Sequence, residues 1–386
     1  MGIICYKINL FGEGRAASRG CFALAVRVAA TKWPDTTHIT TDGTYGIMRV
    51  EEFDYDLPRD MIAQHPSGER EASRLLVFDR EKGTIEHRRF SDITGYLREG
   101  DVLVVNDSRV FPARLRARKG TGGMLDVLLV RPVDGGTWEC LVKGVRGTRD
   151  TIPVSVGDHG AALTRRNGSW TISFVSREEA DEVIGTLGRM PLPPYIKRKG
   201  EDGSADFERY QTVYAEKTGS IAAPTAGFHF SEDLLGRIAA KGVEIVRITL
   251  HVGIGTFSLI HAGLVEDHRM HGERYEMDER SKGLIREARQ EGRRVVACGT
   301  SSVRTVETVF GMNGNGTLSG ETELFIYPGY RFHCVDALIT NFHLPRSTPL
   351  MLVAAFMGAG PLKKAYAEAI RGGYRFYSYG DAMFIS

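Results

Sequence analysis

The sequence predicts an α/β protein of mixed α+β class, in which a small all-β domain is inserted into a larger domain of alternating helices and strands. Three observations lead to this prediction. Short strand patterns follow one another between Ala113 and Val175, whereas helical and strand patterns alternate from Ser231 onwards. The chain has 386 residues, of which 42% are hydrophobic and 25% are charged, so it is long enough for two domains.

The first predicted elements are mainly strands. Alternating runs at Arg74–Asp79 and Thr84–Phe90 predict a hairpin, and Val102–Asn106 is a short apolar strand. The all-β segment contains strand patterns at Ala113–Lys119, Met124–Arg131, Trp138–Lys143, Ala161–Arg165 and Trp170–Val175. Glycine turns separate several of these strands, so the segment predicts a small barrel or a sandwich. A helical pattern follows at Arg177–Leu187.

The C-terminal half alternates between helices and strands. Helical patterns lie at Ser231–Ala240, Asp278–Gln290, from Ser301 or Ser302 to Phe310, Ser347–Met357 and Leu362–Arg371. Strand patterns lie at Val243–Val252, Arg294–Cys298, Glu323–Tyr327 and Ala337–Asn341. This alternation predicts a mixed or parallel sheet that is covered by helices.

Composition and motifs exclude several classes of protein. The cysteines contain no C-x-x-C pair, so we expect a reducing, cytoplasmic location and neither a disulfide scaffold nor a structural zinc site. The apolar run Ser347–Leu362 is too short for a membrane helix and contains two prolines, so we expect no membrane association. No Walker A, G-x-G-x-x-G, H-E-x-x-H or G-x-S-x-G motif occurs, which argues against NTPases, Rossmann dehydrogenases, zincins and serine hydrolases.

Residues 1–47 differ from the rest of the chain. They show no sustained helical or strand period and carry five Lys/Arg and three Asp/Glu. We expect a disordered extension, so that the functional chain begins at Met48; an organelle-targeting peptide is the alternative. Residues 48–386 carry 45 basic and 45 acidic side chains, so a nucleic acid would have to be held by a local basic patch.

Three junctions between a strand and the following loop are candidates for one ligand pocket. They are His251–Thr256, Cys298–Ser302 and Thr340–His343. In open α/β sheets, ligands bind beyond the carboxyl ends of the strands, where glycines and helix amides allow close approach. Ordinary tight turns are the alternative for each junction taken alone, but the three together favour a pocket.

Titratable and aromatic residues gather in two further segments. His268, His271, Glu273 and Glu276 suit general acid–base chemistry. A metal site is less favoured because Gly272 and the turn residues do not predict a helix, and a solvated loop remains an alternative. The segment Gly219–Phe230 combines small residues with two aromatic side chains and a histidine, which suits close contact with a ligand.

Two groups of residues have a second interpretation. Tyr210 and Tyr214 share one face of a predicted helix at Glu208–Tyr214, where their spacing alone favours packing in the core. Nine Lys/Arg and three acids lie between Arg109 and Arg149. Among these basic residues, Arg114, Arg116 and Arg118 alternate, so they share one face of a strand. Such a face suits a phosphate backbone, and a solvated barrel face is the alternative.

Long motifs throughout residues 48–386 resemble those of one enzyme family. They are FDYDLPRDMIAQHP (Phe53–Pro66), ASRLLV (Ala72–Val77), NDSRVFPARL (Asn106–Leu115), MPLPPYI (Met190–Ile196), ERYQTVYA (Glu208–Ala215), GSIAAPTAGFHF (Gly219–Phe230), HVGIGTF (His251–Phe257), HRMHGE (His268–Glu273), ELFIYPGYRF (Glu323–Phe332), TNFHLPRSTPLMLVAAF (Thr340–Phe356) and YRFYSYGDAMFI (Tyr374–Ile385). This pattern resembles the S-adenosylmethionine:tRNA ribosyltransferase-isomerase family of queuosine biosynthesis.

The resemblance implies both a fold and a reaction. The fold is a larger α/β domain, here 48–109 plus 184–386, with a small antiparallel β-barrel inserted at 110–183. The reaction transfers the ribosyl part of S-adenosylmethionine to the aminomethyl group of 7-aminomethyl-7-deazaguanine at the wobble position of tRNA. The ribose is isomerised, giving epoxyqueuosine, adenine and methionine. No metal and no cofactor beyond S-adenosylmethionine as co-substrate are implied.

This implied reaction needs a base near the sulfonium, an acid for the leaving adenine and aromatic faces beside the sulfonium. We expect His229, His271 and Glu273 to be catalytic, and Arg209 or Arg304 to pair with the methionine carboxylate. The expected substrate-binding residues are Arg209, Tyr210, Thr225, Phe228, Gly253, Gly255, Thr256, His268, Thr300, Ser301, Arg304, Asn341, His343 and Asp381. The expected tRNA-binding residues are Arg109, Arg114, Arg116 and Lys143.

Two other functions remain open from the residues. One is an RNA methyltransferase that uses S-adenosylmethionine, against which the missing glycine-rich signature counts. The other is a non-catalytic RNA-binding module, against which the His- and Glu-rich loops count. We expect a monomer whose partners are tRNA and S-adenosylmethionine.

Overall fold

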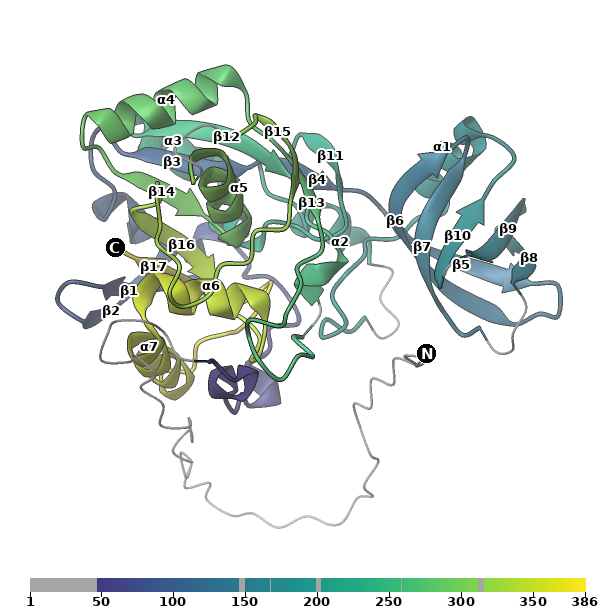
Figure 1. Cartoon of the computed structure of the whole chain (residues 1–386), viewed down its shortest axis with the longest axis horizontal. Coiled ribbons are helices and arrows are strands. Elements are labelled where there is room, and N and C mark those ends of the chain that lie inside the picture. The colour runs from purple at the N-terminus through teal and green to yellow at the C-terminus, as the bar shows by residue number, and fades with distance from the viewer. Residues whose placement is uncertain (1–46, 146–149, 167, 199–202, 258, 312–315) are drawn as a thin grey trace, which may run out of the picture. The chain divides into compact units, whose positions relative to one another are not determined.

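The computed structural model describes residues 47–386 except 146–149, 167, 199–202, 258 and 312–315. The expectation for residues 1–46 lies outside this range. Within it, a large sheet carries helices on both faces, and a separate closed barrel is inserted in the chain, as Figure 1 shows. The predicted fold class, including the antiparallel barrel, is confirmed. None of the helices in this part of the chain has the length and apolar character that a membrane span requires.

A nine-stranded sheet is the central element of the described chain. In spatial order its strands are β15 (Ser319–Thr322), β13 (Glu273–Glu276), β12 (Glu244–Leu250), β3 (Val102–Asn106), β14 (Val295–Cys298), β16 (Ala337–Asn341), β17 (Ala382–Ile385), β1 (Arg74–Asp79) and β2 (Thr84–Arg89). Strands β12, β3, β14 and β16 pair in parallel, so their carboxyl ends lie at the same edge. Strands β3, β14 and β16 are buried at every position, as parallel strands covered on both faces are. A separate pair joins β4 (Ser108–Val110) to β11 (Lys217–Ser220).

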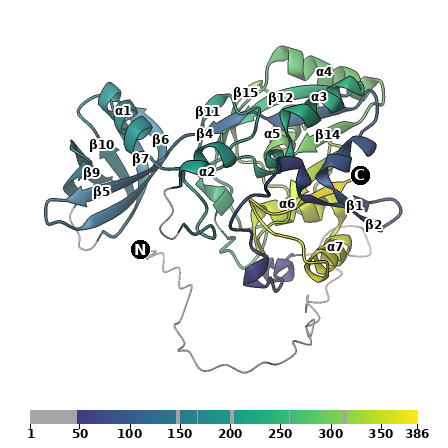
Figure 2. The same ribbon diagram turned by 180° about the vertical axis from the view of Figure 1, so that it is seen from behind.

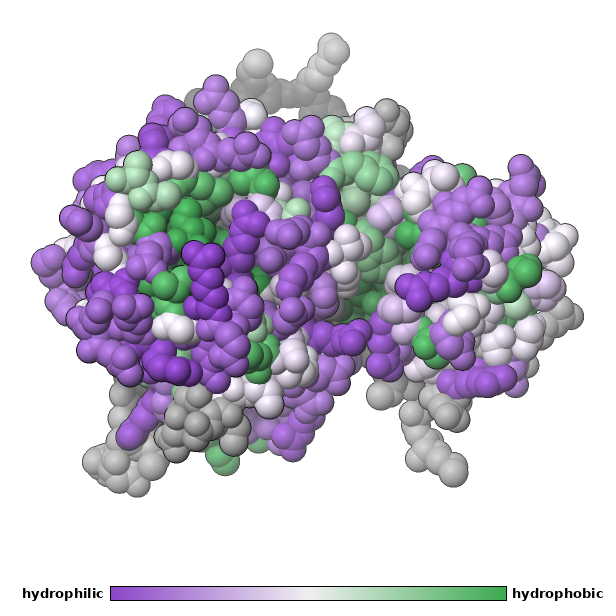
Figure 3. Space-filling view, turned by 90° about the horizontal axis from the view of Figure 1, so that it is seen from above, coloured by the Kyte–Doolittle hydropathy of each residue, from purple (hydrophilic) through white to green (hydrophobic). Residues whose placement is uncertain are grey.

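Helices cover both faces of the large sheet (Figures 1 and 2). One face is covered by α4 (Glu279–Gln290), α5 (Thr300–Phe310), α6 (Thr348–Met357) and α7 (Ala359–Arg371), and the other by α3 (Glu232–Ala240) and the 3₁₀ helix η4 (Phe90–Gly95). Side chains alternate along β3, so that Val102 and Val104 belong to one core and Leu103 and Val105 to the other. The hydrophobic residues visible in Figure 3 show mainly in hollows between hydrophilic side chains.

Polar residues start several of the helices, and the cap at Ser231 is the one that the sequence predicts. The side chain of Ser231 accepts a hydrogen bond from Leu234 N and caps α3, and Asp278 caps α4 in the same way. The remaining short helices are α2 (Ser204–Arg209), η1 (Val50–Phe53), η2 (Arg59–Met61), η3 (Arg70–Ala72), η5 (Thr225–His229) and η6 (Ile254–Phe257).

The inserted barrel closes through six strands of the described chain. Around the barrel they are β10 (Ser169–Ser173), β7 (Thr137–Lys143), β6 (Met124–Asp134), β5 (Arg114–Lys119), β8 (Thr151–Val156) and β9 (His159–Arg166). Helix α1 (Arg177–Leu187) packs Ala180, Val183 and Ile184 into the barrel core. Sequence analysis missed β8 because Pro153 interrupts its pattern. β8 tolerates this proline because it pairs with β5 only through Val154 and Ser155.

Three local predictions are wrong. No strand forms at Glu323–Tyr327; the strand in this part of the described chain is β15, which ends at Thr322. The backbone carbonyl Leu324 O accepts a hydrogen bond from the Arg304 side chain instead of from a neighbouring strand, and Arg304 also donates to Thr322 O. Helix α5 is preceded by Gly299 at φ 87°, rather than being capped by Ser301 or Ser302. The Ser302 hydroxyl donates to Cys298 O, so it is not free to cap.

The third error concerns the two tyrosines that were expected on one helical face. Helix α2 ends at Arg209, before either ring. Both rings are nevertheless buried. Tyr210 packs with Phe228 and Tyr379, whereas Tyr214 lies in the core beneath α3. Packing in the core, the interpretation that their spacing favoured, is therefore the correct one.

Candidate functional site

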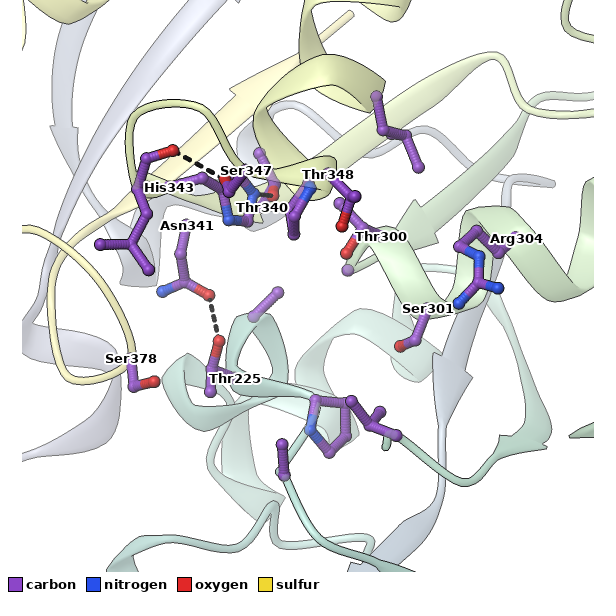
Figure 4. Close-up of a pocket in the computed structure, with 18 of the residues that line it drawn as sticks. Thr225, Thr300, Ser301, Arg304, Thr340, Asn341, His343, Ser347, Thr348 and Ser378 are labelled. Atoms are coloured by element: carbon purple, nitrogen blue, oxygen red, sulfur yellow. Dashed lines mark hydrogen bonds between the residues drawn. The ribbon is translucent and has the colours of Figure 1, made fainter. Parts of the chain in front are cut away.

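A cavity lies at the carboxyl ends of the parallel strands. Val252 follows β12, Gly299–Ser301 follow β14, and Thr340–His343 end and follow β16, and all of them line this cavity. The three junctions therefore form one pocket, as the sequence predicts. Segments from η5, β13 and α6 complete the wall. Figure 4 shows Thr225, Thr300, Ser301, Asn341 and Ser378 around the same space.

One wall of the cavity contains a buried ion pair. Arg304 Nη1 contacts Glu273 Oε2, and the two side chains are 9% and 6% exposed. Arg304 also donates through Nη2 to Thr322 O at 3.0 Å and through Nε to Leu324 O at 2.9 Å. The other carboxylate oxygen, Glu273 Oε1, accepts from Gly253 N at 2.7 Å. The carboxylate is thus held at the first residue of β13 by groups from two other segments, Arg304 of α5 and the backbone of Gly253.

A chain of hydrogen bonds fixes the opposite wall. Thr225 Oγ1 donates to Asn341 Oδ1 at 2.8 Å, and Asn341 Nδ2 lies 3.1 Å from His229 Nε2. Because the Asn341 amide donates there, His229 Nε2 accepts, and His229 Nδ1 carries the proton toward Ser73 Oγ at 2.7 Å. Both Asn341 and Thr225 also line the cavity, so this chain of hydrogen bonds holds two of its polar lining side chains in place.

The second histidine of this region lies in the cavity wall. His343 Nε2 is 2.7 Å from Thr340 Oγ1, and its backbone N–H donates to the Tyr366 hydroxyl at 2.9 Å. Burial lowers the pKa of His343 to about 3. Burial, and then the charges of Arg375 and Arg70, lower the pKa of His229 to about 3. Both imidazoles are therefore neutral at physiological pH, and they serve as hydrogen-bonding groups rather than as cations.

Of the residues expected at the site, several line the cavity together. They are Tyr210, Thr225, Glu273, Thr300, Ser301, Arg304, Asn341 and His343. Four others lie directly behind or beside it. His229 holds Asn341, and Gly253 holds Glu273. His268 packs edge-on against Phe325, which lines the cavity, and the ring centroids are 5.0 Å apart. His271 is exposed and lies against Gly255.

The remaining expected residues lie elsewhere. Arg209 and Phe228 line a separate small cavity, together with His229. Asp381 is buried and accepts from the backbone N–H groups of Arg74 and Arg375, which ties two segments of the fold together. Thr256 lies in η6. Arg304 is occupied by Glu273 and Arg209 lies outside the main cavity, so neither is placed to pair with a carboxylate there.

Several cavity residues were missed by sequence analysis. They are Tyr195, Ser347, Thr348, Tyr377 and Ser378. Ser347 had a signal, since it is the residue at which a helix was predicted to begin, and helix starts commonly contribute to ligand sites. No local pattern in the sequence indicates Tyr195 or Ser378 as a cavity residue. The loop that places Ser378 depends on a positive φ of 70° at Tyr377, and nothing in the sequence requires that conformation.

The expected tRNA-binding residues lie on strands, and all of them except Arg114 are exposed. In the strand register, Asp126 of β6 lies opposite Arg116 of β5 on one side and Lys143 of β7 on the other. Arg114 is half-buried, 3.5 Å from Asp126, and Arg109 is exposed on β4. The alternation along β5 puts Leu115 and Ala117 inside the barrel, as predicted. Among the described residues, no group of three or more His, Cys, Asp or Glu could hold a metal ion.

The neutral histidines predict a pH dependence of stability. Because the pKa of His229 is about 3 in the folded state and about 6.5 in the unfolded chain, only the unfolded chain takes up its proton between these values. The contribution of His229 to the free energy of unfolding is therefore complete above pH 6.5. It decreases by up to about 1.4 kcal/mol per pH unit as the pH drops toward 3. In His229→Asn the imidazole is replaced by an amide that does not titrate, so the free energy of unfolding should decrease less steeply with falling pH, by up to that amount per pH unit. Urea unfolding at pH 7, 6 and 5 measures it, and equal slopes for the two proteins would contradict the assignment.

Comparisons with known proteins identify the family of this chain. Residues 50–385 match the family described as queuosine biosynthesis protein. A protein of Pelobacter propionicus named S-adenosylmethionine:tRNA ribosyltransferase-isomerase is 48% identical over 346 residues, 88% of this chain and 100% of its own length. A protein of Geobacter sulfurreducens with the same name is 48% identical over 344 residues, with the same coverage.

A solved structure is also similar. The crystal structure of S-adenosylmethionine tRNA ribosyltransferase from Thermotoga maritima is 38% identical to this chain, with a TM-score of 0.51. The match covers 86% of this chain and 99% of that one. The chain therefore belongs to the queuosine biosynthesis protein family.

Proposed function

We propose that this chain is an S-adenosylmethionine:tRNA ribosyltransferase-isomerase of queuosine biosynthesis. The observation that carries this conclusion is the 48% identity to relatives of that name over their full length, together with a cavity built from the matched segments, in which polar side chains lie among apolar ones. The reaction moves the ribosyl part of S-adenosylmethionine to the aminomethyl group of the deazaguanine at the wobble position of tRNA. The products are epoxyqueuosine in tRNA, adenine and methionine.

Glu273 is the group in the cavity best suited to act as the base. The sulfonium of S-adenosylmethionine acidifies the neighbouring 5′ carbon, so a carboxylate there can remove a proton. Arg304 and the Gly253 amide keep one orientation of this carboxylate, and preorganisation of this kind lowers the cost of reaching the transition state. Its negative charge also favours binding of the cationic sulfonium.

Histidines and hydroxyls supply the other roles. His271 lies in sequence between Met270 and Glu273, which line the cavity; we assign its imidazole to protonation of the leaving adenine. Asn341, Thr225 and neutral His343 offer hydrogen bonds to the nucleoside, with His229 positioning Asn341. No metal and no further cofactor is required, because S-adenosylmethionine already carries the leaving groups.

A product assay tests this function. The protein is incubated with precursor-containing tRNA and S-adenosylmethionine, and the small products are identified. Free adenine and methionine are the expected result. S-adenosylhomocysteine would instead indicate a methyltransferase, and binding without any product would indicate an RNA-binding module. We further propose that the protein works as a monomer in the cytoplasm, and light scattering with and without tRNA tests the oligomeric state.

The assigned base leads to a mutational prediction. Glu273→Gln should lower single-turnover adenine release by about 100- to 10,000-fold, the usual effect of removing a general base. Affinity for tRNA should change far less, because the interaction acts mainly in the transition state. Asp101→Asn is the matched control, since Asp101 forms a comparably buried pair with Arg294 at 2.5 Å, outside the cavity lining. The control should lose stability but keep its rate below the melting temperature. Near-normal adenine release in Glu273→Gln would remove this residue from the catalytic set.

The barrel face leads to a second prediction. Changing Arg114 and Arg116 to Ala should weaken tRNA binding and reduce the salt dependence of affinity by roughly one unit of slope for each phosphate that is no longer neutralised. Affinity for S-adenosylmethionine should stay unchanged, because neither residue lines the cavity. The charge-matched control changes exposed Arg166 on β9 and Arg177 on α1. If both double variants bind tRNA like the unmodified protein at every salt concentration, Arg114 and Arg116 do not contact tRNA, and the β5 face is exposed only to solvent.

A further inference from the structure

Two arginines lie side by side outside the main cavity. Arg70 Nη1 donates to Phe228 O at 3.2 Å, and Nη2 donates to Glu208 O at 3.3 Å. Arg209 Nη2 donates to Ser67 O at 2.6 Å, and Nη1 donates to Gly68 O at 3.0 Å. Each guanidinium is therefore held by backbone carbonyls. Arg70 binds the carbonyl of Glu208, the residue before Arg209, and Arg209 binds the carbonyls of Ser67 and Gly68, which shortly precede Arg70. This arrangement fixes both cations in place without neutralising either of them.

Among the residues that the structure describes, neither arginine forms a salt bridge with a carboxylate; the charge of Glu208 acts on Arg70 only from a distance and raises its pKa less than burial and Arg209 lower it. Burial, and then the neighbouring charge of Arg209, lower the pKa of Arg70 from its ordinary value. In addition, Arg209 Nε is buried without a hydrogen-bond partner. A buried donor left unpaired costs free energy, and two adjacent like charges repel each other. Both costs would be removed by an anion bound between the two guanidinium groups.

A small cavity accompanies this pair. Arg70, Arg209, His229 and Ser378 are among its lining residues, and its volume is about 10 Å³. That is room for roughly one water-sized group, such as one oxygen of an oxyanion. Ser378 also lines the main cavity, and His229 is hydrogen-bonded to Asn341 in the wall of the main cavity. The arginine pair is thus separated from the proposed reaction site by a single layer of side chains.

We propose that Arg70 and Arg209 bind an oxyanion of the substrate, and that this oxyanion is a tRNA phosphodiester close to the nucleotide whose base enters the main cavity. The inference rests on the proposed function, because it takes tRNA as the substrate. A guanidinium group binds a phosphate oxygen through charge-assisted hydrogen bonds, and one such oxygen fits the small cavity. The α-carboxylate of S-adenosylmethionine is the other possible source. It fits less well because neither arginine lines the cavity assigned to that molecule.

The experiment compares three single variants. Arg70→Gln and Arg209→Gln each remove one charge and two hydrogen bonds to backbone carbonyls. Arg80→Gln is the control, because Arg80, although exposed, also donates to two backbone carbonyls, Phe356 O and Asp336 O, and lies outside both cavities. Affinity for precursor-containing tRNA is measured at several salt concentrations, and the Michaelis constant for S-adenosylmethionine is measured in parallel. Arg209→Lys keeps the charge and tests for rescue.

Both Gln variants should bind tRNA about tenfold more weakly, the effect of removing one charge-assisted hydrogen bond. The salt slope should fall by about 0.7 to 0.9, the value for one phosphate that is no longer neutralised. The Arg80→Gln control should change neither quantity, and Arg209→Lys should recover most of the salt slope, which a purely structural role would not predict.

Two results would overturn the proposal. If tRNA affinity and salt slope match the control, no phosphate is bound. If tRNA affinity is unchanged but the Michaelis constant for S-adenosylmethionine rises, the oxyanion is the carboxylate, and an analogue without that carboxylate should then bind the variant and unmodified proteins equally. Failure of the proposed function gives a different result, since the unmodified protein would then release no adenine.

Discussion

Parallel pairing of β12, β3, β14 and β16 decides where chemistry can take place in this chain. Parallel strands need crossover connections, which place helices on both faces and bury the strands completely. Backbone polar groups inside the sheet are then paired with each other. Loops at the carboxyl edge can offer polar groups, and Val252, Thr300 and Asn341 reach the cavity there. The barrel is free of this constraint, and its strands present charged side chains to solvent.

Buried polar side chains tie the reactive loops to this sheet. Asn106, the last residue of β3, is fully buried and uses its whole amide. Its Nδ2 donates to Leu250 O and Ser301 Oγ, and its Oδ1 accepts from Leu250 N and Ser108 N. One side chain thus joins the ends of two strands to the first turn of α5. Because a buried amide that loses a partner is costly, this network keeps the cavity wall in one arrangement, which a site that stabilises a transition state needs.

The sequence contained the local part of this structure. Continuous apolar strands are encoded within a few residues and are predicted from periodicity. The cap at Ser231 and the three strand-to-loop junctions are predicted from the types of residue that begin or end such runs. Partnerships between distant residues are not encoded in this way. Glu273 and Arg304 are 31 positions apart, and no pattern indicates that one neutralises the other. The neutral state of His229 also depends on burial by segments far from it in sequence, so that the histidine expected as a catalyst lies behind Asn341 instead.

The location of S-adenosylmethionine tests the central claim most directly. A crystal structure of the protein with bound S-adenosylmethionine would show whether the carboxyl edge of the parallel strands is the reaction site. The sulfonium should lie within reach of the Glu273 carboxylate, and the nucleoside between Thr225, Asn341 and the first turn of α5. Density for the ligand on the barrel, or in a cavity that excludes Glu273 and Asn341, would contradict it.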